Sequence, residues 1–455
     1  MSFKIRTQQI NNKYSFKQNI HFGGMIMKKI TIIVLAFVLI GFANIFAQTW
    51  TQQTPTGVTT DLNSIWAVDH NVVWACGPSH VVLRTINGGV NWTSVGAGIA
   101  AGQDLYTVSA YDANICVVGS GDGTLWRTSN GGANWVFIVP TPASVFINVV
   151  HLFPGTPFGF AQGDPVGNLW KLWYTTNQGA NWTTHPTPPT AVGTEAGWNN
   201  SYFALDTGHI WYGTNATKIW KGGMRGPFTS GPTTGEVNSF GVWFNDVNTG
   251  VATMTNASYA VLPNMTSVNG GTSWTVGFAP ANTMFGLRGV PGTGYVWMSG
   301  GSSSLGQIYR STNSGVNWTA QTISVANSVY GLSFVHQGLG WASTAAGKIF
   351  KYVDPNFTGV GTPGNELPTS FKLEQNYPNP FNPSTTINYS IPKASEVSIK
   401  VYDMLGHEVM TLVNEQKNAG NYSVVMDASN LSSGIYLYKI AAGSFNETKR
   451  MTLIK

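Results

Sequence analysis

The chain has few of the residues from which catalytic and metal sites are built. Charged residues make up only 9% of its 455 residues, there are two cysteines, and the eight histidines are scattered. No group of His, Cys, Asp or Glu has the spacing of metal ligands, and no nucleophile–base pair or phosphate-binding loop stands out. The sequence therefore predicts no catalytic residues, no metal and no cofactor.

A basic patch is also lacking, although the net charge is +5 and the pI about 9.0. The first 47 residues hold six Lys and Arg and no Asp or Glu, so the remaining residues have a net charge of −1. Proteins that bind nucleic acid neutralise its phosphates with clustered basic side chains. We therefore expect no nucleic-acid partner.

The N-terminus predicts a secretory signal. Met27-Lys28-Lys29 precedes an apolar run from Ile30 to Ala47, and the small residue Ala47 marks the expected cleavage site before Gln48. The run is also of borderline length for a membrane span. Its N-terminal place favours cleavage, so we expect residues 1–47 to be an upstream extension plus signal peptide. The mature chain is then expected to lack a transmembrane span.

Glycine and tryptophan are abundant, with 53 and 17 residues, which suits an all-β extracellular protein with many tight turns. The pattern Ser/Thr-x-Asn-x-Gly-x-x-Trp occurs five times, with steps of 43, 47, 92 and 44 residues between its tryptophans. The step of 92 covers two periods, so one copy has decayed. Such a period is typical of four-stranded propeller blades. The motif residues are Thr85, Asn87, Gly89, Trp92; Thr128, Asn130, Gly132, Trp135; Thr175, Asn177, Gly179, Trp182; Ser267, Asn269, Gly271, Trp274; and Ser311, Asn313, Gly315, Trp318.

Each motif is interpreted as a hairpin turn between the two outer strands of a blade. Asn tolerates left-handed backbone angles and can bond its own backbone two residues on, and Gly adopts positive φ without steric cost. The Ser/Thr hydroxyl can bond a turn amide, and Trp can cover the turn from below. We expect a structural role for these turns rather than direct ligand contact.

Seven units of this kind can be counted. The first has expected strands at 65–68, 72–77, 81–84 and 92–95. The later units begin near Leu105, Phe146, Trp198, Val237, Phe285 and Val329. The fourth unit holds the decayed copy of the motif at 219–228, which keeps the glycines but lacks the Trp that ends the motif.

The seventh unit ends at 348–352 without a fourth strand, whereas residues 50–54 look like a fourth strand without a blade. We therefore predict a seven-bladed β-propeller over 48–357, with the N-terminal strand completing the last blade and leaving no free sheet edge. Six or eight blades are the alternatives. The turn motif resembles the Asp-box of sialidases, sortilin-type receptors and photosystem II assembly-factor-like propellers, with Asn in place of the usual Asp.

A Gly- and Pro-rich linker at 358–367 separates this domain from a different C-terminal one. Alternating strands are expected at 397–402, 422–426 and 434–440, with a turn at 403–406, which predicts a small Ig-like antiparallel β-sandwich over 368–455.

This tail resembles the type A C-terminal sorting domain of the type IX secretion system. The resemblance lies in the block 376–381, the turn 402–406, Ser433-Gly434-Ile435-Tyr436 and the closing 449–455. It implies transit through the periplasm, recognition of residues 368–455 by the type IX machinery at the outer membrane, and a product that is released or displayed on the surface.

Cys76 and Cys116 fall on the second strands of neighbouring units. Export permits a disulfide, but a bridge needs Cα atoms within about 7 Å, and strands in neighbouring blades are usually farther apart. We favour buried free thiols and leave pairing open.

Three arginines and three carboxylates are candidates for catalytic groups. Arg84, Arg127 and Arg310 occupy one repeat position on separate blades, so the convergence that a sialidase needs is not expected. Paired carboxylates about 5 to 9.5 Å apart would suit a glycosidase. Asp61, Asp104 and Glu236 each precede the first strand of a unit, and their equivalence favours a structural role.

Ligand contacts are expected where the loops between second and third strands gather, on the face opposite the Asn-Gly turns. The candidate ligand-facing residues on that face are His80, Asp122, Asp164, Glu195 and Tyr259.

The sequence thus favours a secreted or surface-displayed non-catalytic propeller that serves as a binding or scaffolding module for an unknown protein or glycan. The alternatives are a polysaccharide-active glycoside hydrolase or carbohydrate-binding propeller, and an assembly factor like the photosystem II relatives.

Overall fold

The computed structural model describes residues 49–53, 57–140, 146–233, 238–354, 357, 370–376, 379–393, 395–417 and 420–454. The predicted signal peptide with Ala47, the linker 358–367 and Glu236 lie outside the described residues. No helix among the described residues is long and apolar enough to cross a membrane.

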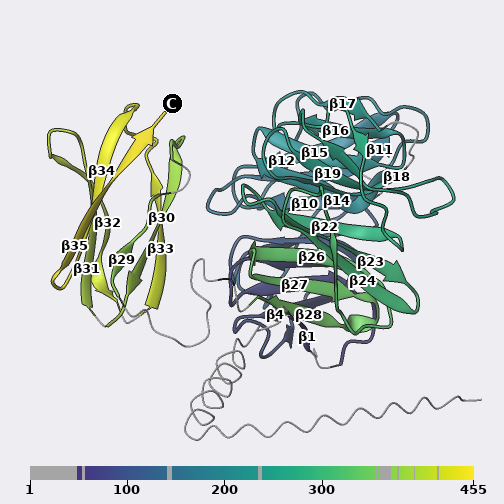
Figure 1. The fold of residues 1–455 in the computed structure, drawn as a ribbon, viewed down its shortest axis with the longest axis horizontal. Coiled ribbons are helices and arrows are strands. Elements are labelled where there is room, and N and C mark those ends of the chain that lie inside the picture. The colour runs from purple at the N-terminus through teal and green to yellow at the C-terminus, as the bar shows by residue number, and fades with distance from the viewer. Residues whose placement is uncertain are drawn as a thin grey trace, which may run out of the picture. The chain divides into compact units, whose positions relative to one another are not determined.

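The fold is all-β and begins with seven four-stranded antiparallel sheets, the blades of a propeller (Figure 1). Blades 1 to 3 comprise β2 (Ser64–Ala67), β3 (Val73–Gly77), β4 (Val81–Thr85), β5 (Thr93–Ser94); β6 (Leu105–Ala110), β7 (Cys116–Ser120), β8 (Leu125–Thr128), β9 (Val136–Ile138); and β10 (Ile147–Leu152), β11 (Gly159–Val166), β12 (Leu169–Thr175), β13 (Thr183–Thr184).

Blades 4 to 6 comprise β14 (Gly197–Asp206), β15 (His209–Thr214), β16 (Lys218–Gly222), β17 (Thr229–Pro232); β18 (Asn238–Phe244), β19 (Gly250–Thr255), β20 (Met265–Ser267), β21 (Thr275–Val276); and β22 (Met284–Val290), β23 (Tyr295–Ser302), β24 (Leu305–Ser311), β25 (Thr319–Gln321). Blade 7 comprises β26 (Val329–His336), β27 (Leu339–Thr344), β28 (Ile349–Val353) and the N-terminal β1 (Thr49–Gln53), with the short 3₁₀ turn η1 (Ala345–Gly347) before β28.

The ring closes as predicted. The first strands of the blades neighbour one another in chain order, and β26 of the last blade lies beside β2 of the first. At the rim of blade 7, β1 pairs with β28, placing Trp50 opposite Tyr352. Trp50 is only 8% exposed because it packs against Phe334 and Tyr352. The N-terminal strand therefore covers an edge that would otherwise be open.

A basic side chain on the third strand joins several blades to the next one. The Nη1 atom of Arg84 donates to Ala113 O and Nε of Arg127 to Gln178 O, each at 2.8 Å. Lys351 Nζ donates to Gly88 O at 2.8 Å, which repeats the contact between blades 7 and 1. The repeat position that carries Arg thus fastens neighbouring blades.

The five motif turns share one hydrogen-bond pattern. In the second copy, Thr128 Oγ1 accepts from the amides of Asn130 and Gly132 at 3.3 and 2.9 Å, while Asn130 Oδ1 accepts from the amide of Asn134 at 2.9 Å. The Asn side chain therefore bonds four residues on, not two as expected. Asn is also not left-handed: the positive φ falls on the next two residues, Gly131 and Gly132 in this copy.

The glycine of the motif serves a second purpose. A Cβ on Gly132 would lie 2.6 Å from Val95 Cβ in blade 1, and one on Gly315 would lie 2.3 Å from Val251 Cγ2 in blade 5. Only a residue without a side chain allows the turn to approach the preceding blade this closely.

The C-terminal part forms the predicted sandwich. One sheet is β29 (Lys372–Leu373), β30 (Ser384–Ile391) and β33 (Gly420–Asp427), and the other is β32 (Glu408–Lys417), β31 (Ser395–Tyr402), β34 (Gly434–Ala442) and β35 (Phe445–Leu453). Their inner faces enclose one apolar core that includes Ile387, Ile399 and Tyr438. Strands β29, β30, β32 and β35 were not anticipated from the sequence.

Candidate functional site

The propeller has two faces. The loop face carries the connections between second and third strands and the starts of the first strands. The turn face carries the motif turns and the ends of the first strands. The candidate residues of the sequence analysis lie on the loop face or in the connections that reach it, but they do not form one cluster.

His80 and Asp122 lie on either side of Gln103. The amide of His80 donates to Gln103 O at 2.6 Å, and Gln103 Nε2 donates to Asp122 Oδ2 at 2.9 Å. Asp122 also accepts from Ser120 Oγ and, at 2.7 Å, from Thr124 Oγ1. Partial burial acts to raise the pKa of Asp122, but these hydrogen bonds together lower it. Asp122 is thus an ionised acceptor that holds its own loop.

Asp164 and Glu195 both hold the chain where it enters blade 4. Asp164 Oδ1 accepts from Asn148 Nδ2 at 2.7 Å and from the amide of Gly197 at 2.9 Å. Burial raises the pKa of Asp164 in spite of these bonds. Glu195 is 5% exposed, and its two oxygens accept from the amide of Val192 at 3.0 Å and from Trp220 Nε1 at 2.8 Å.

The carboxylates that precede first strands make the same kind of contact across blade boundaries. Asp61 Oδ1 accepts from the amide of Ala346 in blade 7, and Asp104 Oδ1 from the amide of Ser79 in blade 1, both at 3.0 Å. Arg310, the third arginine considered for a sialidase site, pairs with Asp354 at 3.5 Å instead of facing the other two. The described acidic residues of this face are therefore engaged with the protein itself.

Tyr259 belongs to a row of aromatic rings that the sequence analysis missed. It is 56% exposed, and its ring centroid lies 5.9 Å from that of Trp198 and 6.3 Å from that of Phe240. The row continues to Phe285, whose ring centroid lies 5.6 Å from that of Phe240. It ends at Tyr330, whose ring centroid lies 5.9 Å from that of Phe285. It crosses blades 4 to 7 along the starts of their first strands.

A repeat signal could have revealed this row. An aromatic residue stands near the start of the first strand in six blades: Tyr106, Phe146, Trp198, Phe240, Phe285 and Tyr330. Phe146, Trp198 and Phe285 mark starts of units in the sequence, whereas Tyr106, Phe240 and Tyr330 were not singled out. Tyr106 and Phe146 form a separate pair with ring centroids 4.7 Å apart.

The middle of the central channel is filled by side chains from blades on opposite sides. Asn200, in left-handed conformation with φ 58°, donates from Nδ2 to Tyr106 O at 2.9 Å, and its Oδ1 accepts from Ser64 Oγ at 3.3 Å. A register shift in β14 between Gly197 and Tyr202 makes room for this crossing. The two faces are therefore separate surfaces.

Both cysteines are free and buried. Burial raises the thiol pKa of Cys76 and of Cys116, which makes both poor nucleophiles. Among the described residues no group of three His, Cys, Asp or Glu side chains is placed to hold a metal ion.

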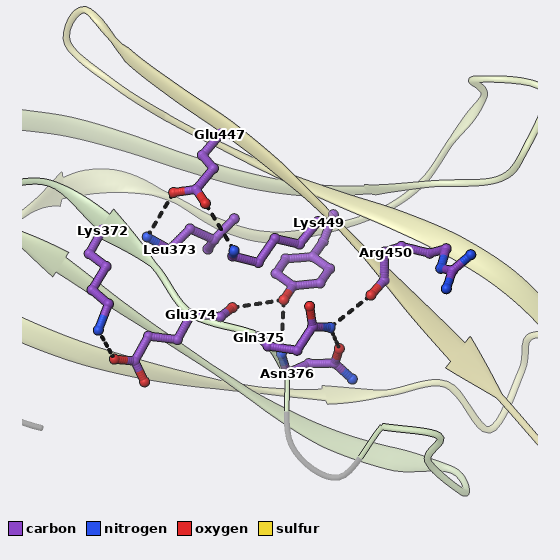
Figure 2. A network of polar contacts seen from close by, with 9 residues as sticks. Lys372, Leu373, Glu374, Gln375, Asn376, Glu447, Lys449 and Arg450 are labelled. Atoms are coloured by element: carbon purple, nitrogen blue, oxygen red, sulfur yellow. Dashed lines mark hydrogen bonds and ion pairs between the residues drawn. The ribbon is translucent and has the colours of Figure 1, made fainter. Parts of the chain in front are cut away.

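In the C-terminal domain the structure brings the two ends of the recognised signature together (Figure 2). The amide of Asn376 donates to Tyr438 Oη at 2.8 Å, and Gln375 Nε2 donates to Arg450 O at 2.8 Å. Asn379 Oδ1 accepts from the amide of Thr452 at 2.9 Å. The opening block thus lies along the closing strand β35.

Comparison with known proteins also separates the C-terminal sandwich from the propeller. Residues 375–455 match the family model of the secretion system C-terminal sorting domain. Through this domain the chain is exported by the type IX system to the cell surface or the medium. No curated protein matches the sequence.

Solved structures that resemble the chain are propellers. YCF48 bound to a D1 peptide is 15% identical with a TM-score of 0.53, covering 67% of this chain and 97% of its own. YCF48 from Cyanidioschyzon merolae is 17% identical with a TM-score of 0.52, covering 67% and 98%. The GH74 enzyme of Niastella koreensis is 13% identical with a TM-score of 0.50, covering 90% and 75%. At these identities the likeness concerns the fold, and the chain is an exported β-propeller with a C-terminal sorting domain.

His151 gives a pH-dependent prediction. It is 7% exposed on β10, between Phe153 and Tyr202, and burial followed by the charge of Arg288 lowers its pKa to about 3. The unfolded chain has a His pKa of about 6.5. Between these two pKa values the unfolded state binds a proton on this histidine that the folded state does not bind. Because of His151, the free energy of unfolding should therefore fall by about 3–5 kcal/mol as pH falls from about 6.5 to about 3.

The measurement is urea unfolding of the wild type and of His151→Phe from pH 7 to 4. The variant, which keeps a ring but cannot be protonated, should lose less stability over this range. If the free energy of unfolding fell equally with pH in the wild type and in the variant, His151 would not be the source of the pH dependence.

Proposed function

We propose that the protein is a non-catalytic binding module, delivered outside the outer membrane, that holds its ligand on the loop face. Its repeats are of the Asp-box type with Asn in place of Asp, and its N-terminus is a secretory signal cleaved after Ala47. The rigid ring presents the loop face, and the C-terminal domain, assigned to 368–455, supplies the export address.

The row of aromatic rings from Trp198 to Tyr330 supports this proposal most directly. Exposed aromatic faces bind ligands by desolvation and ring stacking. Trp198, Phe285 and Tyr330 are half-buried rather than fully packed, and Tyr259 is mostly exposed. The protein thus covers one part of these rings and holds them in place, while another part stays accessible to a ligand.

The state of the carboxylates argues against catalysis at the same face. A glycosidase needs one carboxylic acid and one carboxylate directed at the substrate. Asp122 and Glu195 use both oxygens on neighbouring donors, and Asp61, Asp104 and Asp164 bond backbone amides across loops. Their geometry suits positioning of loops, not proton transfer.

A glycan is the ligand class that the rings favour. The C–H faces of sugar rings pack on aromatic faces, and a row of rings can follow a chain of sugars. The likeness in fold to a GH74 enzyme keeps a polysaccharide-active hydrolase as the alternative, and the peptide bound by YCF48 keeps a protein ligand as another.

A glycan array and a pull-down with the full-length protein test the proposal. Tyr259→Asn removes one ring but suits the left-handed backbone at this position, where φ is 59°. It should weaken glycan binding about three- to tenfold. The matched control is Phe137→Ala, because Phe137 is 52% exposed on β9 away from the row. Release of reducing sugars would show that the protein is a hydrolase. Capture of a protein without any glycan binding would show that the ligand is a protein and would contradict the glycan proposal.

Export provides a second prediction. Deletion of residues 368–455 should leave the propeller in the periplasm, because the outer-membrane step recognises this segment. Immunoblots of periplasm, surface and medium would be compared with those of the full chain. Delivery of the truncated chain at normal levels would contradict the role of the tail.

A further inference from the structure

The turn face holds a cavity at its end of the central channel. Its volume is about 320 Å³, and the first strands of blades 1, 3, 4, 6 and 7 line it. Most of its wall is apolar or aromatic, including Trp66, Phe153, Phe203, Phe334 and Val335. Pockets of about 300 Å³ or more accept small ligands.

The cavity is cut off from the loop face. Toward the middle of the channel the neighbouring free space beside Asn200, Tyr202 and Arg288 has a volume of only about 20 Å³, roughly that of one water molecule. A ligand in the cavity therefore approaches from the turn face only, and it lies apart from the aromatic row described above.

Arg288 supplies a positive charge in this wall. Its guanidinium lies over the ring of Tyr202, 4.7 Å from the centroid. Nη1 donates to Tyr202 O at 2.8 Å and to Leu287 O at 3.0 Å, and Nη2 reaches Asn200 O at 3.5 Å. These three contacts leave part of the five-donor capacity of a guanidinium unused.

No acid in the described part of the chain neutralises Arg288. Within the described ranges no carboxylate lies at ion-pair distance from it, and no Asp or Glu is among the residues that line the cavity. A half-buried cation without a counterion is costly. Arg288 is held in place by backbone carbonyls, which fix its position without cancelling its charge.

The other ionisable side chains of the wall, His151 and Tyr202, are uncharged near neutral pH, and burial raises the pKa of the Tyr202 hydroxyl further above 7. His151 bonds Tyr202 Oη through Nδ1 at 3.2 Å. Burial and the charge of Arg288 hold its pKa far below 7. An anion entering the cavity therefore meets one fixed cation inside a largely apolar wall.

We propose that this cavity binds a carboxylate joined to an apolar body of about the size of one aromatic amino acid, with Arg288 as its anchor. A guanidinium matches a carboxylate through two parallel N–H···O bonds, and the aromatic wall accepts the apolar body. Two sources share this chemistry: the C-terminal residue of a peptide, and a free aromatic acid.

Calorimetric titration of the full-length protein tests the proposal with three probes. N-acetyl-phenylalanine represents a peptide terminus, 3-phenylpropionate represents a free acid, and N-acetyl-phenylalaninamide has the same body without the charge. The first two should bind and the amide should not. A preference between the first two identifies the source.

Two variants locate the site. Arg288→Met should weaken binding of the acids about ten- to a hundredfold, the usual value of a hydrogen-bonded charge, and Arg288→Lys should retain part of it. The control is Arg225→Met, since Arg225 also lies 4.7 Å above a tyrosine ring, that of Tyr174, but outside the cavity.

The comparison of acid and amide on the wild type does not depend on whether Arg288→Met folds. Equal binding of acid and amide, no binding of either acid, or full binding by a folded Arg288→Met would overturn the proposal. Glycan binding at the loop face should be unchanged by Arg288→Lys. The proposal for the cavity and the proposal for the aromatic row can therefore be refuted independently of each other.

Discussion

The pairing of the first strand with the last blade, which has only three strands without it, is the constraint on which the rest of the structure depends. A row of seven repeated sheets has two free ends unless the chain returns to its start. Strand β1 provides this return, because it takes the outermost position of blade 7 and pairs in register with β28. Trp50 completes the apolar cluster of Phe350 and Tyr352, and Lys351 bonds the next blade. Circular closure fixes the distance of every first strand from the axis, and so creates the surfaces at both ends of the channel.

Those surfaces combine residues that are far apart in the sequence. Arg288 is 86 residues from Tyr202, whose carbonyl holds it, and Asn200 reaches Ser64, 136 residues away. Neither contact belongs to the repeat. The repeat builds identical turns and blade-to-blade bonds, whereas single departures from it, one arginine on β22 and one left-handed residue in β14, give the channel its chemistry. Function in such a ring is expected where the units differ.

The same distinction explains what the sequence could and could not predict. Blade number, ring closure and the hairpin position of Thr128 to Trp135 follow from periodicity, which repeats each signal several times. Arg288 occurs once, and nothing in a single sequence shows whether an acid faces it. The engagement of Asp122 and Glu195 was also hidden, because loop hydrogen bonds depend on three-dimensional proximity. In the tail, β32 (Glu408–Lys417) was missed because its outward face is charged and its alternation weak. The cleavage site at Ala47 and the role of Glu236 stay predictions.

Hydrogen–deuterium exchange of the native full-length protein tests ring closure most directly. If β1 is an integral strand of blade 7, its paired amides should exchange as slowly as those of β28 and should become exposed together with them in one opening step. Amides of β1 that exchange within seconds while β28 stays protected would show that the N-terminal strand does not close the ring, and would contradict the account.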